Sequence, residues 1–297
     1  MDYEVVTDLN KSDIFNVAHK FTSLKGSEFN PLEIDFLFAF VTQIDEKDEA
    51  FKEYRIDKAT LEEKMNRRLE NKRISTLFKS LIGKYIEAED EKKIRTYSIF
   101  DTLVFDKEEK VYTVQFSSKM KPFLLKLKPY TKGYLSDIFK LESTYSKKLY
   151  LLCAQWRTAG SFKIKVDKLM EELGIKEGST YSTYGEFKRK VLKTAEKNML
   201  EKSSIYFEYK EKKIGARVDE ITFIIKTNRT RKEEEPKLFE LELSDTQKEL
   251  NKYVGSKIEG HIIRGFRVVE SDIYVETDVG DYRFLNIETL KQQVKRG

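Results

Sequence analysis

The 297-residue sequence has few of the residues that build cross-links or metal sites: one cysteine, Cys153, and two histidines, His19 and His261. A single cysteine cannot close a disulfide within the chain, and Cys153 lies in the apolar run LYLLCAQW, where a thiol acts as a small hydrophobic side chain. The histidines are far apart in the sequence, and no HExxH or CxxC spacing occurs. We therefore predict no metal site.

The sequence also lacks an apolar run of the roughly 18 to 20 residues that a membrane helix needs. Its first residues, MDYEVVTDLNKSD, are acidic and contain no hydrophobic run, so no signal peptide is expected. A GxxxxGK[ST] phosphate-binding loop is absent. These features predict a cytoplasmic protein that has no cofactor and no catalytic residues, and therefore is not an enzyme.

Proline and glycine are scarce, with 4 and 13 residues, so most of the chain is expected to lie in helices and strands. Two segments break this pattern. Residues 126–134 contain Pro129 and Gly133, and residues 226–237 are highly charged and contain Pro236. The predicted domains are residues 1–128, 129–232 and 233–297.

The first two predicted domains share one order of elements: helix, strand, helix, helix and two-stranded hairpin. In the first domain these elements fall at residues 31–44, 51–56, 57–69, 71–86, 96–105 and 110–116. In the second they fall at residues 135–160, 161–166, 167–175, 183–199, 203–210 and 219–226. Expected caps and stops are Asp57 and Asp167 at helix starts, a capping box of Thr183 with Glu186, and Gly174 at a helix end.

This order of elements is that of a winged helix-turn-helix, and it occurs twice. Residues 233–297 add a short helix, three strand-like runs and a terminal helix. The predicted fold class is therefore α+β: tandem winged helix-turn-helix domains followed by a small C-terminal α+β unit. The core of that last unit is predicted from its apolar residues Ile258, Ile262, Ile263, Phe266 and Val268.

The charge is unevenly distributed. Residues 233–297 carry 14 acidic and 10 basic side chains, a net charge of −4, so residues 1–232 carry +9 of the total of +5. A basic body with an acidic tail favours a polyanionic partner for the body.

The segment YSTYGEFKRKVLKTAEKNML, which starts at Tyr181, concentrates this positive charge on one helix. Helical spacing places Phe187, Val191, Ala195 and Asn198 in one arc, with Leu192 and Met199 at its edge. The opposite side is basic, which is typical of a helix that enters the DNA major groove. The predicted contacts are Arg189 as the main base reader, Lys190, Lys193, Lys197, and the hydroxyls of Ser182 and Tyr184 at the entry.

Two neighbouring features strengthen this prediction over a merely solvated lysine face. A short helix precedes the segment, as in a helix-turn-helix. The hairpin that follows carries Lys212, Lys213 and Arg217 at its tip, where a wing reaches phosphates. In the first domain the corresponding set of predicted contacts is Arg67, Arg68, Lys72, Arg73 and Lys79.

In these blocks the chain resembles the iteron-binding plasmid replication initiators, the Rep family with two winged-helix domains. The resemblance lies in STYSKKLYLLCAQWRTAG from Ser143, FKIKVDKLMEELGI from Phe162, YGEFKRKVLKTAEKNM from Tyr184 and the hairpin ending in DEITFIIK. It covers roughly residues 10 to 228, and in the first domain it rests mainly on element order.

The resemblance implies binding of double-stranded DNA at direct repeats, called iterons, in a plasmid origin. It also implies opening of the duplex, recruitment of host replication initiator and helicase-loading proteins, dimerisation, and repression of the protein's own gene. It assigns base reading to Arg189, Lys190 and Lys193.

Three other functions stay open: a repressor with two winged helices, an architectural DNA-binding protein, and a rolling-circle nicking enzyme. The nicking enzyme is disfavoured because such enzymes hold a metal with closely spaced histidines, and this chain has no histidine pair.

Overall fold

The computed structural model describes residues 5–6, 13–45, 48–90, 92–125, 130–228, 250–258, 261–269, 272–277, 281–284 and 287–294. The chain forms two compact units. The first comprises Met1–Leu152, Glu172–Gly174 and Glu201–Ser203, and the second comprises Cys153–Glu171, Ile175–Leu200 and Ser204–Gly297.

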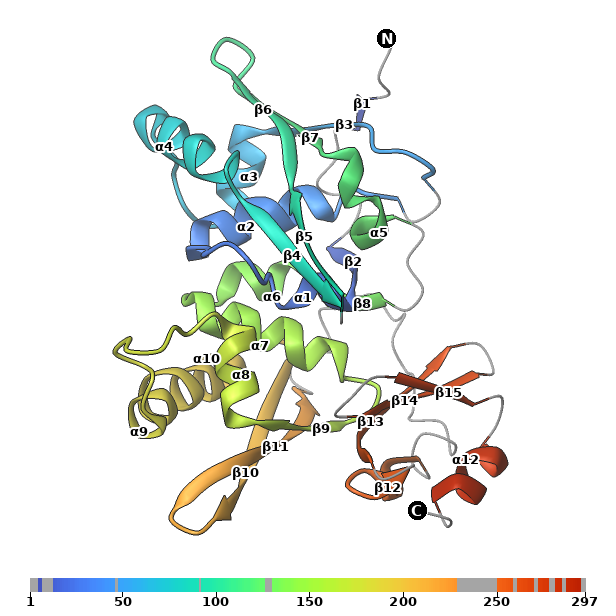
Figure 1. The fold of residues 1–297 in the computed structure, drawn as a ribbon. Helices are drawn as coiled ribbons and strands as arrows, with labels where there is room; N and C mark the ends of the chain where they lie inside the picture. The colour runs from blue at the N-terminus through green and yellow to red at the C-terminus, as the bar shows by residue number, and fades with distance from the viewer. Residues whose placement is uncertain are drawn as a thin grey trace. The chain divides into compact units, whose positions relative to one another are not determined.

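The first unit contains most of the elements from the amino-terminal half of the chain (Figure 1). Its strands are β1 (Val5–Val6), β2 (Ile14–Ala18), β3 (Glu53–Asp57), β4 (Tyr85–Asp90), β5 (Lys93–Ser98), β6 (Phe100–Asp106), β7 (Val111–Phe116) and β8 (Tyr130–Tyr134). Its helices are α1 (His19–Thr22), α2 (Pro31–Val41), α3 (Lys58–Lys64), α4 (Asn71–Leu81), η1 (Ser118–Met120), α5 (Lys121–Leu124), α6 (Leu135–Lys140) and most of α7 (Thr144–Gln155).

The first unit contains a winged helix, and α2 is its buried central helix. Nine of the eleven residues of α2 are buried, Glu33 and Asp35 among them, and Asn30 and Glu33 close a capping box at its start. Asp57 caps α3, because its carboxylate accepts a hydrogen bond from the Thr60 N–H at 3.0 Å. Strand β7 pairs with β3 and with β6, in the sheet order β1-β3-β7-β6.

A second hairpin is inserted between α4 and β6, and the sequence did not predict it. The predicted helix 71–86 ends at Leu81, and the chain continues into β4. The predicted strand 96–105 is two strands: β5 pairs with β4, while β6 pairs with β7. The chain changes sheets at Ile99, whose side chain is buried. The predicted helix 71–86 and the predicted single strand 96–105 were therefore both wrong. The apolar pattern of a sequence does not show which strand pairs with which.

The second unit contains a winged helix and the carboxyl-terminal elements. Its strands are β9 (Ser161–Lys165), β10 (Ile205–Ile214), β11 (Arg217–Thr227), β12 (Lys257–Ile258), β13 (His261–Val269), β14 (Asp272–Thr277) and β15 (Asp281–Phe284). Its helical segments are most of α8 (Val166–Leu173), α9 (Tyr184–Phe187), the π-helical η2 (Lys188–Leu192), most of α10 (Lys193–Lys202), η4 (Asn251–Tyr253) and α12 (Ile287–Val294).

The winged helix of the second unit repeats the pairing of the first. Strand β11 lies between β10 and β9, so in both units the second hairpin strand pairs with the strand before the helix-turn-helix. Phe223 of β11 stacks on Phe162 with ring centroids 4.8 Å apart. Helix α8 stops before Gly174, which has a φ of +76°, as predicted. The predicted fold class, tandem winged helices, is confirmed.

The predicted helix over residues 135–160 was wrong, because two helices occupy this range. Helix α6 ends at Lys140, and the next residue, Leu141, is extended, with φ −80° and ψ 130°. The next helix, α7, starts at Thr144, and the Ser143 hydroxyl accepts a hydrogen bond from the Ser146 N–H at 2.9 Å. Apolar side chains continue through the break, so helical periodicity alone did not reveal it.

The first unit also extends beyond the predicted seam at residues 126–134. Strand β8 pairs with β2, and the ring of Phe15 lies against Gly133: a Cβ there would be 2.2 Å from Phe15 Cζ. Residues 126–129 lie outside the described residues, as do 229–249, which hold most of the second predicted seam. The first unit therefore reaches Leu152, and the roles assigned to the three predicted domains stay predictions.

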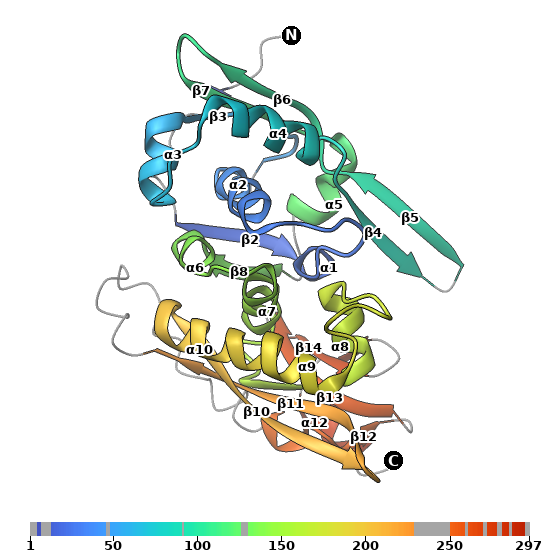
Figure 2. The ribbon, with the colours of Figure 1, turned by 90° about the vertical axis from the view of Figure 1, so that its left-hand side faces the viewer.

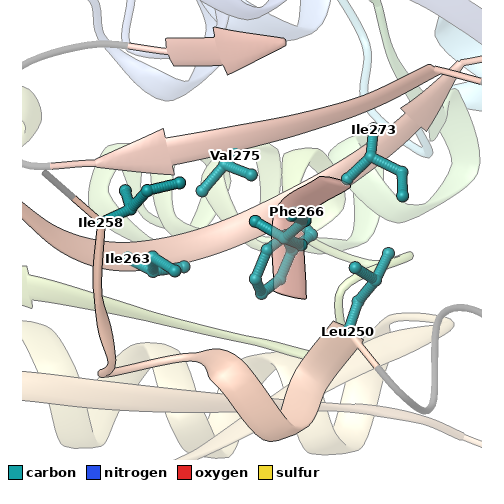
Figure 3. Close-up of a cluster of buried hydrophobic side chains, with 7 residues drawn as sticks. Leu250, Ile258, Ile263, Phe266, Ile273 and Val275 are labelled. Atoms are coloured by element: carbon teal, nitrogen blue, oxygen red, sulfur yellow. The ribbon is translucent and has the colours of Figure 1, made fainter. Parts of the chain in front are cut away.

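The carboxyl-terminal elements have a core of their own (Figure 3). Ile258, Ile263 and Phe266 are buried in it, together with Leu250, Ile273, Val275 and Leu290. Strand order β12-β13-β14-β15 makes a four-stranded antiparallel sheet. The side chains of Ile262 and Val268, which were also predicted to lie in this core, fall outside the described residues.

Two adjacent lysines of α7 are buried in the first unit. Nζ of Lys147 forms an ion pair with Asp35 of α2 and donates to the carbonyl of Ile138 in α6. Nζ of Lys148 lies 3.3 Å from the carbonyl oxygen of Leu173, and burial lowers its pKa to about 8. Burial also raises the pKa of Asp35 and lowers that of Lys147, so each charge depends on the other.

Replacing Lys147 by Met should destabilise the protein by about 3–5 kcal/mol, because the charge of Asp35 would be left buried without its partner. The double variant Lys147→Met/Asp35→Leu should recover most of this loss. Urea denaturation of the three proteins measures the effect. Equal losses in the single and double variants would contradict this interpretation of the pair.

Gly133→Ala should destabilise the protein by about 1–3 kcal/mol, because the added methyl group overlaps the buried ring of Phe15. Gly185→Ala is the matched control: its added Cβ meets no atom within 4 Å, and alanine favours a helix by about 0.5–1 kcal/mol. Thermal unfolding should order the proteins as Gly185→Ala, wild type, Gly133→Ala, from most to least stable. A Gly133→Ala protein as stable as wild type would contradict the close contact.

Candidate nucleic-acid interface

One continuous helix of three segments, α9, η2 and α10, forms the candidate interface of the second unit (Figure 2). We call residues 184–202 the basic helix. Its buried side chains include Phe187, Val191, Ala195 and Met199, at a constant spacing of four residues. Leu192 and Met199, predicted at the edge of the stripe, are buried, whereas the predicted core residue Asn198 is only half-buried.

The π turn explains this spacing. Each step of four residues in an α-helix overshoots a full turn by about 40°, so three steps would move the stripe by about 120°. A π turn has i→i+5 hydrogen bonds and more residues per turn, which offsets the overshoot. The stripe therefore stays on the core side from Phe187 to Met199.

The basic side chains of this helix point away from the core, as predicted. Arg189, Lys190, Lys193 and Lys197 are all exposed. The helix starts after Thr183, but the predicted capping box is wrong: the Thr183 side chain makes no cap hydrogen bond.

Glu186, the expected partner in that box, binds two cations of its own helix. Its carboxylate oxygens accept from Nη2 of Arg189 at 2.9 and 2.8 Å, and Nζ of Lys190 lies 3.4 Å away. The hydrogen bond from Arg189 lowers the pKa of Glu186. Glu186 is therefore ionised at neutral pH and partly cancels the charge of this face.

Glu211 of β10 is a site residue that the sequence analysis did not single out. Its carboxylate accepts from the Tyr184 hydroxyl at 2.7 Å and lies 2.7 Å from Nζ of Lys188. Burial disfavours its ionised form, but hydrogen bonds from Lys188 and Tyr184 outweigh burial and lower its pKa. Through these two contacts, Glu211 links the start of the basic helix to the β10–β11 hairpin. Tyr184 and Glu211 are 27 residues apart in the sequence, so no local pattern reveals their contact.

The two predicted entry hydroxyls already donate hydrogen bonds within the protein. Ser182 donates to the Ser179 carbonyl at 2.7 Å, and Tyr184 donates to Glu211. Burial raises the pKa of Tyr184 well above its usual value, and the bond to Glu211 adds to this effect. Each hydroxyl would have to give up its bond before it could donate to a phosphate.

The β10–β11 hairpin has a tight turn at Gly215, whose φ is +61°, and exposes Lys212 and Lys213 next to it. Nη2 of Arg217 lies 2.6 Å from the Asp167 carboxylate, and both side chains are more than two-thirds exposed. Asp167 was predicted to cap α8, but it lies within the first turn of that helix. All three predicted wing cations are therefore at the surface, and one of them, Arg217, is paired.

The first unit presents a weaker version of this surface. Arg68, Lys72, Arg73 and Lys79 are exposed on α4 and the turn before it. Arg67 is exposed too, and it lines a cavity of about 500 Å³ together with Asp35 and Lys140. The tip of the β6–β7 hairpin, residues 106–110, has three acidic and two basic side chains, in contrast to the basic tip in the second unit.

Among the described residues, no group of three or more His, Cys, Asp or Glu side chains could hold a metal ion. None of the helices described is long and apolar enough to cross a membrane. Cys153 is buried, as predicted, and burial strongly raises its thiol pKa.

The chain matches two family models. Residues 14–154 match "Initiator Replication protein, WH1" and residues 165–225 match "Initiator Rep protein, WH2", which together cover more than half of the 297 residues. A curated relative, "Probable replication protein rep" from Bifidobacterium longum (strain NCC 2705), is 23% identical over 178 residues. That alignment covers 58% of this chain and 59% of the relative, so the match spans about three fifths of the relative's length.

A solved structure supports the same fold. The Pi initiator protein, crystallised in complex with iteron DNA, aligns with a TM-score of 0.61 and 17% identity. The alignment covers 74% of this chain and 99% of Pi. Together with the two matched models and the paired winged helices, these findings show that the chain belongs to the family of initiator replication proteins with two winged-helix domains.

Proposed function

We propose that the protein is a plasmid replication initiator that binds direct repeats at a replication origin. The observation that carries this proposal is the exposed row of cations on the basic helix, next to a hairpin whose tip is also basic. Family membership supports it, and so does the Pi initiator, a protein of similar fold whose structure contains iteron DNA.

In this proposal the basic helix enters a major groove. Arg189 is the main base reader, because its planar guanidinium can donate two hydrogen bonds to O6 and N7 of guanine. Lys190 and Lys193 contact bases or nearby phosphates, and Lys197 contacts a phosphate. Lys212, Lys213 and Arg217 bind the backbone from the wing.

The first unit contributes a second DNA contact through Arg68, Lys72, Arg73 and Lys79, with Arg67 at its margin. Two winged helices in one chain can engage successive major grooves about 10 bp apart, so one molecule can occupy one repeat. The less basic hairpin tip of this unit favours a weaker contact with phosphates.

The proposal extends to the wider role that the family resemblance implies. The protein opens the duplex, recruits host replication initiator and helicase-loading proteins, self-associates as a dimer and represses its own gene. It acts in the cytoplasm, needs no cofactor and has no catalytic activity. In the three predicted domains, residues 1–128 serve dimerisation and backbone contact, and residues 129–232 provide most of the sequence-specific binding.

Gel shift with the DNA that flanks the protein's own gene tests the proposal. With random competitor present, the number of discrete complexes should match the number of direct repeats. A single complex on an inverted repeat would indicate a repressor, and no preference over competitor would indicate an architectural protein. Incubation of supercoiled origin DNA with magnesium or manganese should produce no nicks; nicking would favour a rolling-circle enzyme.

Arg189→Ala should weaken binding to the direct repeat by about 1–3 kcal/mol, the contribution of one good bidentate base contact. Binding to random DNA should change much less. Fluorescence anisotropy with both DNAs measures the two affinities. An equal loss on both DNAs would place Arg189 on a phosphate instead of a base.

The double variant Lys212→Ala/Lys213→Ala should weaken binding to both DNAs to a similar extent. The slope of log K against log salt should fall in magnitude by about 2, because each phosphate contact contributes about 0.9. Lys226→Ala is the control: Lys226 lies at the other end of the hairpin, paired with Glu208 at 2.6 Å. A salt slope unchanged in the double variant would remove the wing from the interface.

A further inference from the structure

The basic helix carries a carboxylate, Glu186, that is already bound to two of the residues proposed to contact DNA. We propose that Glu186 is a positioning residue that sets the specificity of binding: it holds Arg189 ready for a base and reduces the attraction of this face for phosphates. The inference rests on the DNA-binding function proposed above.

The geometry leaves donors of Arg189 available. Both hydrogen bonds to Glu186 use the same nitrogen, Nη2. No hydrogen bond from Nε or Nη1 of Arg189 is found among the described residues. A guanidinium has five N–H donors, so Arg189 can stay on Glu186 while its remaining donors meet a base edge. A side chain held in one orientation loses less conformational freedom when it binds.

The negative charge of Glu186 has the opposite effect on non-specific binding, which it weakens. Affinity for DNA of any sequence depends on how many phosphates the cations neutralise. Glu186 lies within 3.4 Å of two exposed cations, Arg189 and Lys190, and offsets part of their charge. Base contacts depend on positioned donors more than on net charge. One carboxylate can therefore disfavour random DNA while it favours the correct sequence.

A purely structural role makes a different prediction. Glu186 lies three and four residues before its partners, and such intrahelical pairs stabilise a helix by about 0.2–0.5 kcal/mol. If that were its only role, Glu186→Gln would slightly lower the melting temperature and leave the ratio of the two affinities unchanged. The ratio is therefore the informative measurement.

The experiment compares wild type, Glu186→Gln and Glu208→Gln. Glu208→Gln is matched to the first variant, because it removes the same charge and an exposed ion pair, 2.6 Å to Lys226, in the same unit. Lys226 is outside the proposed contact set. Dissociation constants are measured by fluorescence anisotropy for a direct-repeat duplex and a random duplex of equal length, at low and high salt.

Glu186→Gln should bind the random duplex about fivefold to tenfold more tightly at low salt, through one more effective cation. It should bind the direct repeat no more tightly than wild type does, so the preference for the repeat falls by at least the same factor. The gain on random DNA should shrink at high salt, and Glu208→Gln should keep the wild-type preference.

Two results would overturn the inference: an unchanged preference in Glu186→Gln, or the same loss of preference in Glu208→Gln. These results would leave the proposed function standing if wild type prefers the direct repeat. A wild-type protein with no such preference would overturn the proposed function first, and the inference with it.

Discussion

The first unit depends on the burial of one charged group, the ammonium of Lys147. An ammonium has three N–H donors, and leaving them unsatisfied in an apolar interior costs several kcal/mol. Asp35 of α2 and the Ile138 carbonyl of α6 accept two of the three possible hydrogen bonds, and Asp35 also balances the charge. Helices α2, α6 and α7 must therefore meet at one point. The break between α6 and α7 fits the same constraint, because it allows α7 to direct Lys147 back at α6.

The burial of Lys147 also shows what could not be predicted from the sequence, namely contacts between residues far apart along the chain. The apolar spacing within residues 71–86 predicted α4, and Asp57 predicted the start of α3, because both signals are local. Lysine side chains are mostly exposed in proteins, yet Lys147 and Lys148 are both buried. Their burial depends on partners in Asp35 and Leu173, which no local pattern connects to them. The same reason explains why the sequence did not reveal the β4–β5 hairpin.

The candidate interface shows the same division. The exposure of its cations could be predicted, because the buried stripe of the basic helix fixes which side faces outward. The carboxylates that bind these cations could not be predicted in the same way. The Glu186 carboxylate could have paired with Arg189 or closed a capping box with Thr183. It pairs with Arg189, and the capping box does not form. Glu211 reaches Tyr184 through the fold of the hairpin. The surface is thus a balanced set of charges and not a plain cationic row.

The π turn at Lys188–Leu192 has a consequence for comparing this helix with those of relatives. A π turn holds one more residue than an α-helical path between the same two points. A relative without it should be one residue shorter between Phe187 and Ala195. If an alignment places the gap elsewhere, residues such as Lys193 are aligned one position away from their true counterparts in the relative. Side chains on different faces of the two helices are then compared with each other. Transferring base-contact positions between family members therefore requires a gap within this turn.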